Sequence, residues 1–293
     1  MTTAPQDHLS FTISRSDLTN SILIPKYYDP ELAAATEFAA SEYMLPRLGE
    51  LVLPGALGSR LGVWIRREHY GTGTVPYVRT SDLHNWRLRP DYKKGVARDV
   101  YEDVAARQDV SPGDILMVAH GTYLVGTVAM VTEEDLPLVL QDHVFRLRLN
   151  PDIPERYAPI DPWLLLAALS TRFVRRQTRA KQFSADIIDK IGDRHTEIRV
   201  PLPRHRDRRA SIAQAAKKAV RDQSGIRRSI AGILVSDMRM TRERSEARYG
   251  FSVPRSSVAE LILIPKYYDP SLTEALAEAA ARTRTDWVSI GQL

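Results

Sequence analysis

The residues Ile-Leu-Ile-Pro-Lys-Tyr-Tyr-Asp-Pro occupy positions 22–30 and recur, letter for letter, at positions 262–270. The match extends towards the N-terminus of each copy, because Phe11 reappears as Phe251 and Arg15 as Arg255. The shift between the copies is 262 − 22 = 240 residues, whereas solenoid repeats run only ~20–50 residues. The sequence is therefore interpreted as one long unit followed by the opening of a second.

The repeat divides the chain into four expected parts. Residues 1–44 are expected to form a docking segment and a helix, and residues 45–204 a globular domain with a mixed β core. Residues 205–248 are expected to form a long helical arm. Residues 249–293 repeat the N-terminal segment and open an incomplete second domain. The expected fold class is α/β, in the α+β sense, with one globular domain and its arm.

Hydrophobic periodicity predicts the elements within these parts. Helices are predicted over 31–43 and 162–181, and from 206 to about 248 with a weak point at Ser224-Gly225. Strands are predicted over 22–24, 48–53, 115–119, 124–131, 138–149 and 198–202, and apolar and basic residues alternate from Val144 to Leu149. A helix of ~40 residues needs a partner outside the β core, and a homodimer through 205–248 would supply one.

The charge balance favours a partner that carries phosphate. Lysine and arginine number 41 against 36 aspartate and glutamate residues, which gives a formal net charge of +5. The arginines gather at 172–179, 204–209 and 239–248. A guanidinium fork matches the oxygens of a phosphate, although a solvated helix face explains any one cluster better. Charge alone does not decide for nucleic acid.

The sequence shows no signal for a membrane or an oxidising compartment. It has no cysteine, which excludes disulfides and thiolate metal sites. Residues 1–8 lack the basic-then-apolar pattern of a signal peptide, and no apolar run approaches the ~20 residues that span a bilayer. A cytoplasmic location is expected.

Motifs of common catalytic sites are missing from the sequence. It has neither a phosphate-binding loop ending in Lys-Ser/Thr nor a Gly-x-Ser-x-Gly elbow, and its seven histidines show no zinc-type spacing. Asp91 and Lys93 resemble a fragment of a nuclease site, but so short a spacing is common by chance. The chain is interpreted as non-catalytic and without a cofactor.

Three segments between the predicted strands combine small, polar and basic residues: 71–74, 80–85 and 120–123. Asn, Arg, Ser and Thr side chains read base edges, and glycine lets the backbone approach closely. Each segment alone is better explained as an ordinary loop. Their recurrence beside the predicted basic helix at 172–181 strengthens a DNA-reading hypothesis.

An ordered series of motifs resembles the specificity subunit of type I restriction–modification systems. The residues that carry the resemblance are Leu45–Leu51 and Asp286–Leu293 (for W-V-x-L-G-x-L), Pro76–Leu83 (P-Y-I-R-x-x-D-I), Ser111–Leu116 (x-x-G-D-I-L), Gly126–Ala129 (G-x-x-A), Gln141–Arg146 (Q-x-x-V-x-R) and Ile198–Pro203 (I-x-I-P-L-P). The resemblance covers residues 45 to 245, and each motif alone is weak. Two features depart from it: the repeated nine residues, and the presence of only one complete recognition domain.

The resemblance implies a DNA target recognition domain at 45–204 and a spacer helix at 205–248, with catalysis left to a partner DNA methyltransferase. Further implied partners are double-stranded DNA and a restriction or translocase subunit. A half-length subunit would pair with itself and read a palindromic split site; truncation of a longer subunit is the alternative. The residues expected to contact DNA are Arg79, Thr80, Ser81, His84, Asn85, His120, Thr122, Tyr123, Arg175, Arg176, Arg179 and Lys181.

The repeated tyrosines have two interpretations. Tyr27, Tyr28, Tyr267 and Tyr268 either dock on the methyltransferase or strap their segment along the helical arm. The alternative for the whole protein is a non-reading scaffold of a phage-defence system, which recruits an enzyme through its long helix. A nuclease that uses Asp91 and Lys93 is a third hypothesis.

Overall fold

The computed structural model describes residues 11–18, 22–90, 92–121, 123–184 and 189–236, together with residues 277, 280 and 281. The chain divides into two compact units, Met1–Val220 and Arg221–Leu293. The first unit combines helices with several small sheets, so the expected mixed α/β class is confirmed.

A four-stranded antiparallel sheet forms the centre of the first unit. Its order is β2 (Ser59–Leu61), β10 (Val144–Leu147), β7 (Ile115–Val118) and β8 (Val128–Met130). β7 follows a tight turn in which the Asp114 N–H donates to the Ser111 carbonyl at 3.1 Å, as a Pro-Gly-Asp sequence predicts. All four residues of β7 are buried, which confirms the strand predicted after this turn.

The alternation of apolar and basic residues in β10 does not separate a buried face from an exposed one. Arg146 is 1 % exposed, and its guanidinium donates to the carbonyls of Leu57 at 3.0 Å and Ala56 at 2.9 Å. Arg148, one residue after the strand, forms ion pairs with Asp114 and Asp109. Both arginines therefore hold loops beside the sheet, and neither contributes to a free basic surface.

A smaller sheet joins β3 (Val75–Val78) to β6 (Gly95–Val96) and β9 (Val139–Leu140). The helix α3 (Arg98–Gln108) is tied to it, because the buried Gln108 side chain accepts the Leu140 N–H at 2.6 Å. The single strand predicted over 138–149 is therefore wrong. It is two strands in different sheets, since the chain turns where the Val144 N–H donates to the Gln141 carbonyl.

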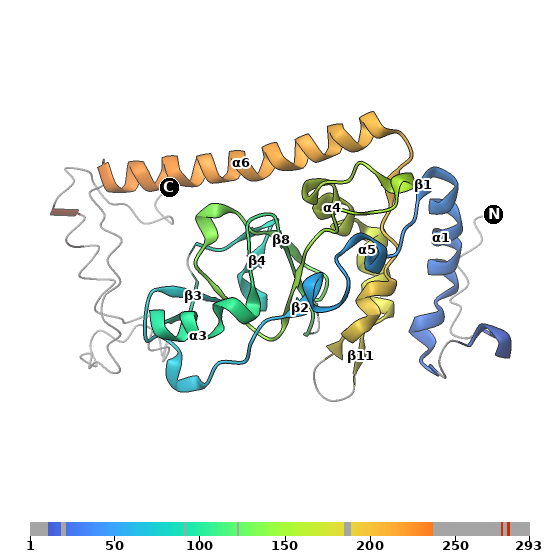
Figure 1. Ribbon diagram of the computed structural model, residues 1–293, viewed down its shortest axis with the longest axis horizontal. Helices are drawn as coiled ribbons and strands as arrows, with labels where there is room; N and C mark the ends of the chain where they lie inside the picture. Colours follow the sequence, from blue (N-terminus) through green and yellow to red (C-terminus); the bar gives the residue numbers. More distant parts are fainter. Residues whose placement is uncertain are drawn as a thin grey trace, which may run out of the picture. The chain divides into compact units, whose positions relative to one another are not determined.

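Three helices pack beside the strands: α1 (Pro30–Glu42), α4 (Pro162–Leu169) and α5 (Arg172–Ala180). Each begins at a side chain that accepts backbone N–H groups, which are Asp29, Asp161 and Thr171 in turn. The helix predicted at 31–43 is confirmed. The single helix predicted at 162–181 is two helices, because Ser170 ends α4 and Thr171 caps α5. Within the first unit, Figure 1 shows α1 and α3 at opposite ends.

Two segments predicted as strands have other structures. Leu48–Leu51 is the short helix α2, because the Glu50 carboxylate accepts the Arg47 N–H at 2.7 Å and closes the turn. Residues 22–24 belong to no strand, although Ile24 is extended, and the 3-10 helix η2 (Pro25–Tyr28) follows them. At 198–202 only the last residue belongs to a strand, β13 (Leu202–Pro203), which lies antiparallel to β1 (Tyr43–Met44). The other short elements are η1 (Arg15–Asp17), η3 (Gly55–Leu57), η4 (Arg67–His69), η6 (Glu133–Asp135), η7 (Glu155–Tyr157), β11 (Phe183–Ser184) and β12 (Asp189–Lys190).

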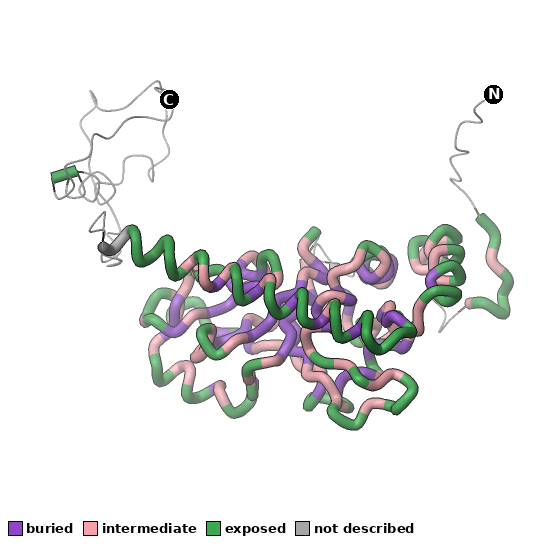
Figure 2. The backbone as a smooth tube through the Cα atoms, turned by 90° about the horizontal axis from the view of Figure 1, so that it is seen from above, coloured by how far each residue is buried: buried purple, intermediate pink, exposed green. Residues whose placement is uncertain are grey.

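The long helix α6 (Arg206–Ser236) has 31 residues, roughly 45 Å at the rise of an α-helix. It starts where predicted and passes through Ser224-Gly225 without a break, while its predicted continuation to 248 lies outside the described residues. Its Ala213, Ala216 and Val220 are buried in the first unit. Further along, Ile226, Ile230 and Ile233 are exposed and share one helical face, the isoleucine face. Figure 2 colours the backbone of this last described part of α6 as exposed.

A buried histidine links η8 (Gly192–Glu197) to the central sheet. His195 stacks on Phe145 with ring centroids 4.2 Å apart. Its Nδ1 lies 2.7 Å from the Gly192 carbonyl and its Nε2 lies 2.6 Å from Ser59 Oγ. A ring that donates from Nδ1 and accepts at Nε2 is neutral. Burial lowers the pKa of His195 from its usual 6.5.

The depressed pKa of His195 predicts sensitivity to acid. As the pH falls below 6.5, the unfolded state takes up a proton that the folded state binds only at lower pH. The free energy of unfolding should therefore fall as the pH drops below about 6.5. Denaturant melts at a series of pH values from neutral downwards should show a shallower loss of unfolding free energy for His195→Gln than for the wild type. His205→Gln, at an exposed position, should leave the slope unchanged, and a slope shared by the wild type and His195→Gln would contradict the prediction.

Candidate nucleic-acid interface

The strands β4 (Leu83–His84) and β5 (Arg87–Leu88) form a hairpin whose two-residue turn is Asn85-Trp86. Both turn residues have a positive φ, 47° for Asn85 and 67° for Trp86, which is the backbone geometry of a type I′ turn. Asparagine tolerates this conformation, but a bulky side chain rarely adopts it, and it costs about 1–3 kcal/mol. Contacts with the rest of the fold must therefore hold Trp86.

Two hydrogen bonds fix Trp86. Its indole Nε1–H donates to Ser170 Oγ at 2.6 Å, between α4 and α5. Its carbonyl accepts the Met130 N–H from β8 at 2.9 Å. The hairpin turn is thus attached to the central sheet and to the start of α5. Sequence periodicity does not predict either hydrogen bond. Ser170 lies inside the single helix predicted over 162–181, and Asn-Trp lacks the glycine that is typical of two-residue hairpin turns.

The hairpin tip exposes two polar side chains, His84 and Asn85. At its base the buried Asp82 accepts the Arg79 N–H at 2.9 Å and lies 3.9 Å from Arg79 Nε. The Arg79 side chain is thus held beside a carboxylate and is partly exposed. The 3-10 turn η5 (Thr80–Asp82) precedes the hairpin, and its Thr80 and Ser81 are half-buried. Of the predicted contacts in this segment, His84 and Asn85 are the most accessible.

The second predicted reading loop, 120–123, lies on α5 and the residues after it. Gln182 Nε2 donates to the Gly121 carbonyl at 3.3 Å. Gly126 packs on the helix, where an added Cβ would lie 2.9 Å from Thr178 Cγ2. Its φ of 82° also favours glycine. A larger residue at 126 would therefore lift the loop from α5.

The side chains of the 120–123 loop differ in exposure. Tyr123 is 74 % exposed and is the accessible group of the loop. His120 is half-buried, and its ring centroid lies 4.8 Å from that of His143. Thr122 lies outside the described residues. Tyr123 is therefore the residue of this loop that is best placed to touch a ligand.

The helix α5 turns a basic row outward. Its Val174, Gln177 and Thr178 are buried. The Gln177 amide donates to the Arg199 carbonyl and accepts the Arg199 N–H, both at 2.8 Å, so the orientation of the helix is fixed. The exposed side chains of this row are Arg172, Arg175, Arg176 and Arg179.

Two of the predicted phosphate ligands already have ionic partners within the chain. Arg176 pairs with Asp29 at 2.8 Å and with Glu31 at 2.6 Å. Lys181 pairs with Glu197 at 2.5 Å. In the part of the chain that the structure describes, neither Arg175 nor Arg179 forms an ion pair. Arg175 and Arg179 are therefore better candidates for phosphate contact than the other two.

The repeated tyrosines of the first copy pack within the chain. The Tyr27 hydroxyl donates to Glu197 Oε2 at 2.8 Å, and its ring lies edge-on to Phe183 with centroids 5.9 Å apart. Burial, and then the hydrogen bond to Glu197, raise the pKa of Tyr27 to about 12. The Tyr28 hydroxyl donates to the Ile22 carbonyl at 2.8 Å. These contacts favour packing over docking on a methyltransferase. Outside the described residues lie Tyr267 and Tyr268.

The structure brings two of the three polar loops to α5 and separates the third. The hairpin reaches Ser170 just before α5, and the 120–123 loop contacts Gln182 just after it. The loop 71–74 instead belongs to the smaller sheet, since the Gly71 N–H donates to the Gly95 carbonyl at 2.7 Å. The candidate interface therefore consists of His84, Asn85, Tyr123, Arg175 and Arg179.

Other kinds of site have little support in the described residues. Asp91 lies outside them, so the nuclease pair with Lys93 has no geometry to assess. The described ranges hold no group of three or more histidine, aspartate or glutamate side chains that could bind a metal ion. Among the described helices, none is both long and apolar enough to cross a membrane.

Comparisons with known proteins find a likeness to solved structures alone. No family model and no curated protein matches the chain. One similar structure is the S subunit of a type I restriction-modification system from M. genitalium, with 15 % identity and a TM-score of 0.43 over 71 % of this chain and 47 % of that chain. A second comes from work on complex assembly and conformational transition of the type I R-M system, with 15 % identity and a TM-score of 0.39 over 71 % and 48 %. A third is the HsdS subunit from Thermoanaerobacter tengcongensis, with 14 % identity and a TM-score of 0.34 over 68 % and 46 %.

The chain spans less than half the length of each of these solved chains. All three come from the class of protein that the ordered motifs resemble. At this identity the likeness concerns the fold.

Proposed function

We propose that this chain is a DNA-sequence specificity subunit of a type I restriction–modification system, which directs a partner methyltransferase and a restriction subunit to a target site. The observation that carries the proposal is the hairpin turn at Asn85-Trp86. Its left-handed backbone is unfavourable for tryptophan, and hydrogen bonds to Ser170 and Met130 hold it in place. Strain that packing maintains is typical of functional sites.

Each part of the candidate interface has a separate task in this proposal. The Asn85 amide carries a donor and an acceptor side by side, the pattern that pairs with adenine in the major groove. Tyr123 offers an exposed ring and hydroxyl to a neighbouring base. Arg175 and Arg179 neutralise phosphates, which sets the register of the protein on the duplex and makes affinity depend on salt. The chemistry on DNA belongs to the partner subunits.

The helix α6 supports the part of the proposal that concerns partners. The isoleucine face leaves Ile226 60 %, Ile230 52 % and Ile233 53 % exposed. Apolar residues at this spacing form the seam of a helix pair. A second copy of the chain, paired through 205–248, would cover the face and place two recognition domains on a palindromic split site.

Selection from a random pool of duplexes tests the base-reading role. With its methyltransferase present, the wild type should enrich one sequence. Asn85→Gly should relax the preference at one position by about 1–3 kcal/mol, because the discriminating amide is lost. Glycine keeps the φ of 47° without strain, so folding should be unchanged. A wild-type chain that enriches nothing would favour the scaffold hypothesis and contradict the proposal.

Arginine substitutions on α5 separate phosphate contacts from base contacts. Arg175→Ala and Arg179→Ala should each weaken binding to all duplexes alike. Each should also reduce the slope of log K against log salt by about 1, because each side chain neutralises one phosphate. Fluorescence anisotropy over a series of salt concentrations measures the slope. Arg66→Ala, whose side chain is 69 % exposed, is the control and should leave the slope unchanged. A shift in sequence preference in either α5 variant would assign it to base reading instead.

A further inference from the structure

The N-terminal repeat lies on a defined patch of the first unit. This patch, the strap surface, consists of Arg176, Lys181, Phe183 and Glu197. Residues 22–42, the first strap, cover it. Tyr27 contacts Glu197, Phe183 and Lys181, whose Nζ lies 4.5 Å from the Tyr27 ring centroid. Asp29 accounts for the contact with Arg176.

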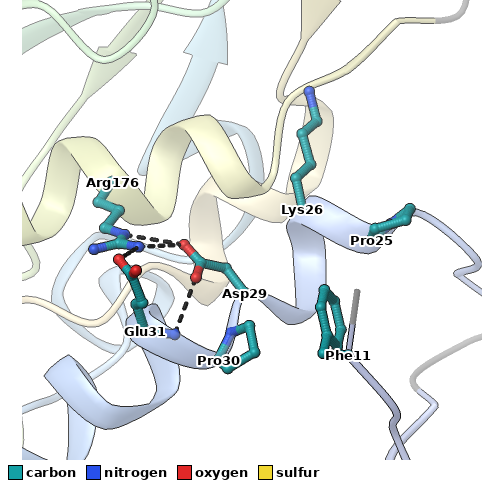
Figure 3. Close-up of a pocket in the computed structure, with 7 residues that line it drawn as sticks. All are labelled: Phe11, Pro25, Lys26, Asp29, Pro30, Glu31 and Arg176. Atoms are coloured by element: carbon teal, nitrogen blue, oxygen red, sulfur yellow. Dashed lines mark hydrogen bonds and ion pairs between the residues drawn. The ribbon is translucent and has the colours of Figure 1, made fainter. Parts of the chain in front are cut away.

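Asp29 joins docking of the strap to the start of its helix. Its Oδ2 accepts from Arg176 Nε at 3.0 Å and from Nη2 at 2.8 Å. Its Oδ1 accepts the N–H groups of Glu31 at 3.0 Å and Leu32 at 3.3 Å, which caps α1. Figure 3 shows the Arg176 guanidinium pointing at the carboxylates of Asp29 and Glu31. One carboxylate therefore serves both contacts.

The second copy of the repeat keeps the groups that make these contacts. Tyr27 and Asp29 recur as Tyr267 and Asp269. The Tyr28 hydroxyl, which donates to the Ile22 carbonyl, has its counterpart in Tyr268. Glu31, which is 79 % exposed in its pair with Arg176, is replaced by a serine. The side chains that are packed in the first copy are thus present in the second.

The packed and exposed positions of α1 can be compared in the same way with the corresponding residues of the second copy. Three of its half-buried or buried positions recur unchanged, with Leu32, Ala35 and Ala39 matched by Leu272, Ala275 and Ala279, while the half-buried Thr36 is replaced by Leu276. Its outer face has changed, with Ala34, Glu37 and Phe38 replaced by Glu274, Ala277 and Glu278. Phe38 is 74 % exposed. The two copies therefore agree at three of the four positions of α1 that pack in the first copy, and differ at most of the positions that face solvent.

We propose that the second strap, residues 262–282, binds the strap surface of a second copy of this chain. On that copy it takes the place of the first strap. The exchange changes few contacts, because the tyrosine and aspartate are the same in both straps and an exposed ion pair such as Glu31–Arg176 contributes little. Exchange of equivalent elements between protomers is a low-cost route to a dimer. The inference holds whether or not the chain reads DNA.

Cysteine cross-linking tests the exchange, because the chain has no cysteine of its own. One full-length variant carries Lys266→Cys in the second strap. The other carries Arg172→Cys, an exposed position one helical turn before Arg176. Mixed and treated with a short bis-maleimide, the two should give a cross-linked pair that contains one chain of each variant. Mass spectrometry identifies the two joined peptides.

Exchange of charge makes the test specific. Asp269→Arg in the first variant should lower the yield about tenfold, because it repels Arg176, and Arg176→Glu in the second variant should restore it. If Arg176→Glu does not fold, Arg176→Gln in the second variant takes its place and should also lower the yield. The inference is overturned if the mixed pair does not form, or if its yield stays the same when these charges are changed. A cross-link found only within single chains that carry both cysteines also overturns it, because the second strap would then occupy its own chain.

Discussion

Replacing Asp114 with alanine is expected to lower the free energy of unfolding by about 3 kcal/mol, as removal of one partner from a buried ion pair does. Asp114 is 2 % exposed. Its carboxylate accepts from Arg148 Nε and Nη2, both at 2.8 Å, and from the Ser111 N–H at 2.8 Å. The substitution therefore removes the cap of the turn before β7 and leaves a guanidinium short of a counter-charge. The loss lies at the low end of the range because Arg148 is 25 % exposed.

Asp109 provides a matched control on the same arginine. Its carboxylate lies 2.7 Å from Arg148 Nη1, but its side chain is 47 % exposed. Asp109→Asn, which removes the charge but keeps a side chain that tolerates the φ of 49° at this position, should therefore cost less than about 1 kcal/mol. Adding Arg148→Ala to Asp114→Ala should recover part of the larger loss, because it removes the unpaired charge. Urea unfolding followed by circular dichroism measures these three variants and the wild type. Equal losses for the two aspartates would show that burial does not set the cost.

The sequence predicts those parts of the fold that local chemistry determines. The turn before β7 needs a glycine, and Gly113 has a φ of 92° there. The helix α1 begins at Asp29-Pro30, where the aspartate caps it and the proline suits its first turn. The start of α6 at Arg206 is also predicted from neighbouring residues. In each case the deciding residues lie within a few positions of the element.

Contacts between distant residues decide the elements that the sequence does not predict. The run from 138 to 149 has a continuous β pattern, yet its two halves pair with Tyr77 and Met117 in different sheets. The alternation in β10 suggests an exposed Arg146, but carbonyls of residues 56 and 57 hold it inside. No window of local sequence contains these partners.

The candidate site likewise has features that local sequence predicts and features that only distant contacts determine. Polar loop composition draws attention to 80–85 and 120–123, and the arginine spacing to α5. Composition does not reveal which arginines are neutralised, because Arg176 meets Asp29 across 147 positions of sequence. It also does not reveal the strained turn, whose anchor Ser170 lies 84 positions from Trp86. A stretch of sequence can therefore name candidate side chains, while tertiary contacts decide which of them are available.

Replacing Trp86 with alanine is expected to destabilise the protein by about 3 kcal/mol and to abolish its preference for one DNA sequence. The stability loss follows from removal of a large, partly buried ring together with its hydrogen bond to Ser170. Alanine would also keep the unfavourable positive φ. The loss of preference follows because the tip that carries Asn85 would no longer be held against β8 and α5. Urea melts measure the first effect, and selection from a random duplex pool measures the second.

Trp86→Gly separates the two causes, since glycine adopts the φ of 67° without strain. It should be more stable than Trp86→Ala by about 1 kcal/mol, yet it should lose the sequence preference to the same extent, because the indole anchor is missing from both. Its salt dependence should match the wild type, because Arg175 and Arg179 stay in place on α5. If the glycine variant is no more stable than the alanine variant, the turn stores no strain. If it folds and still selects the wild-type sequence, the anchored hairpin does not read DNA, and the proposed function loses the observation on which it stands.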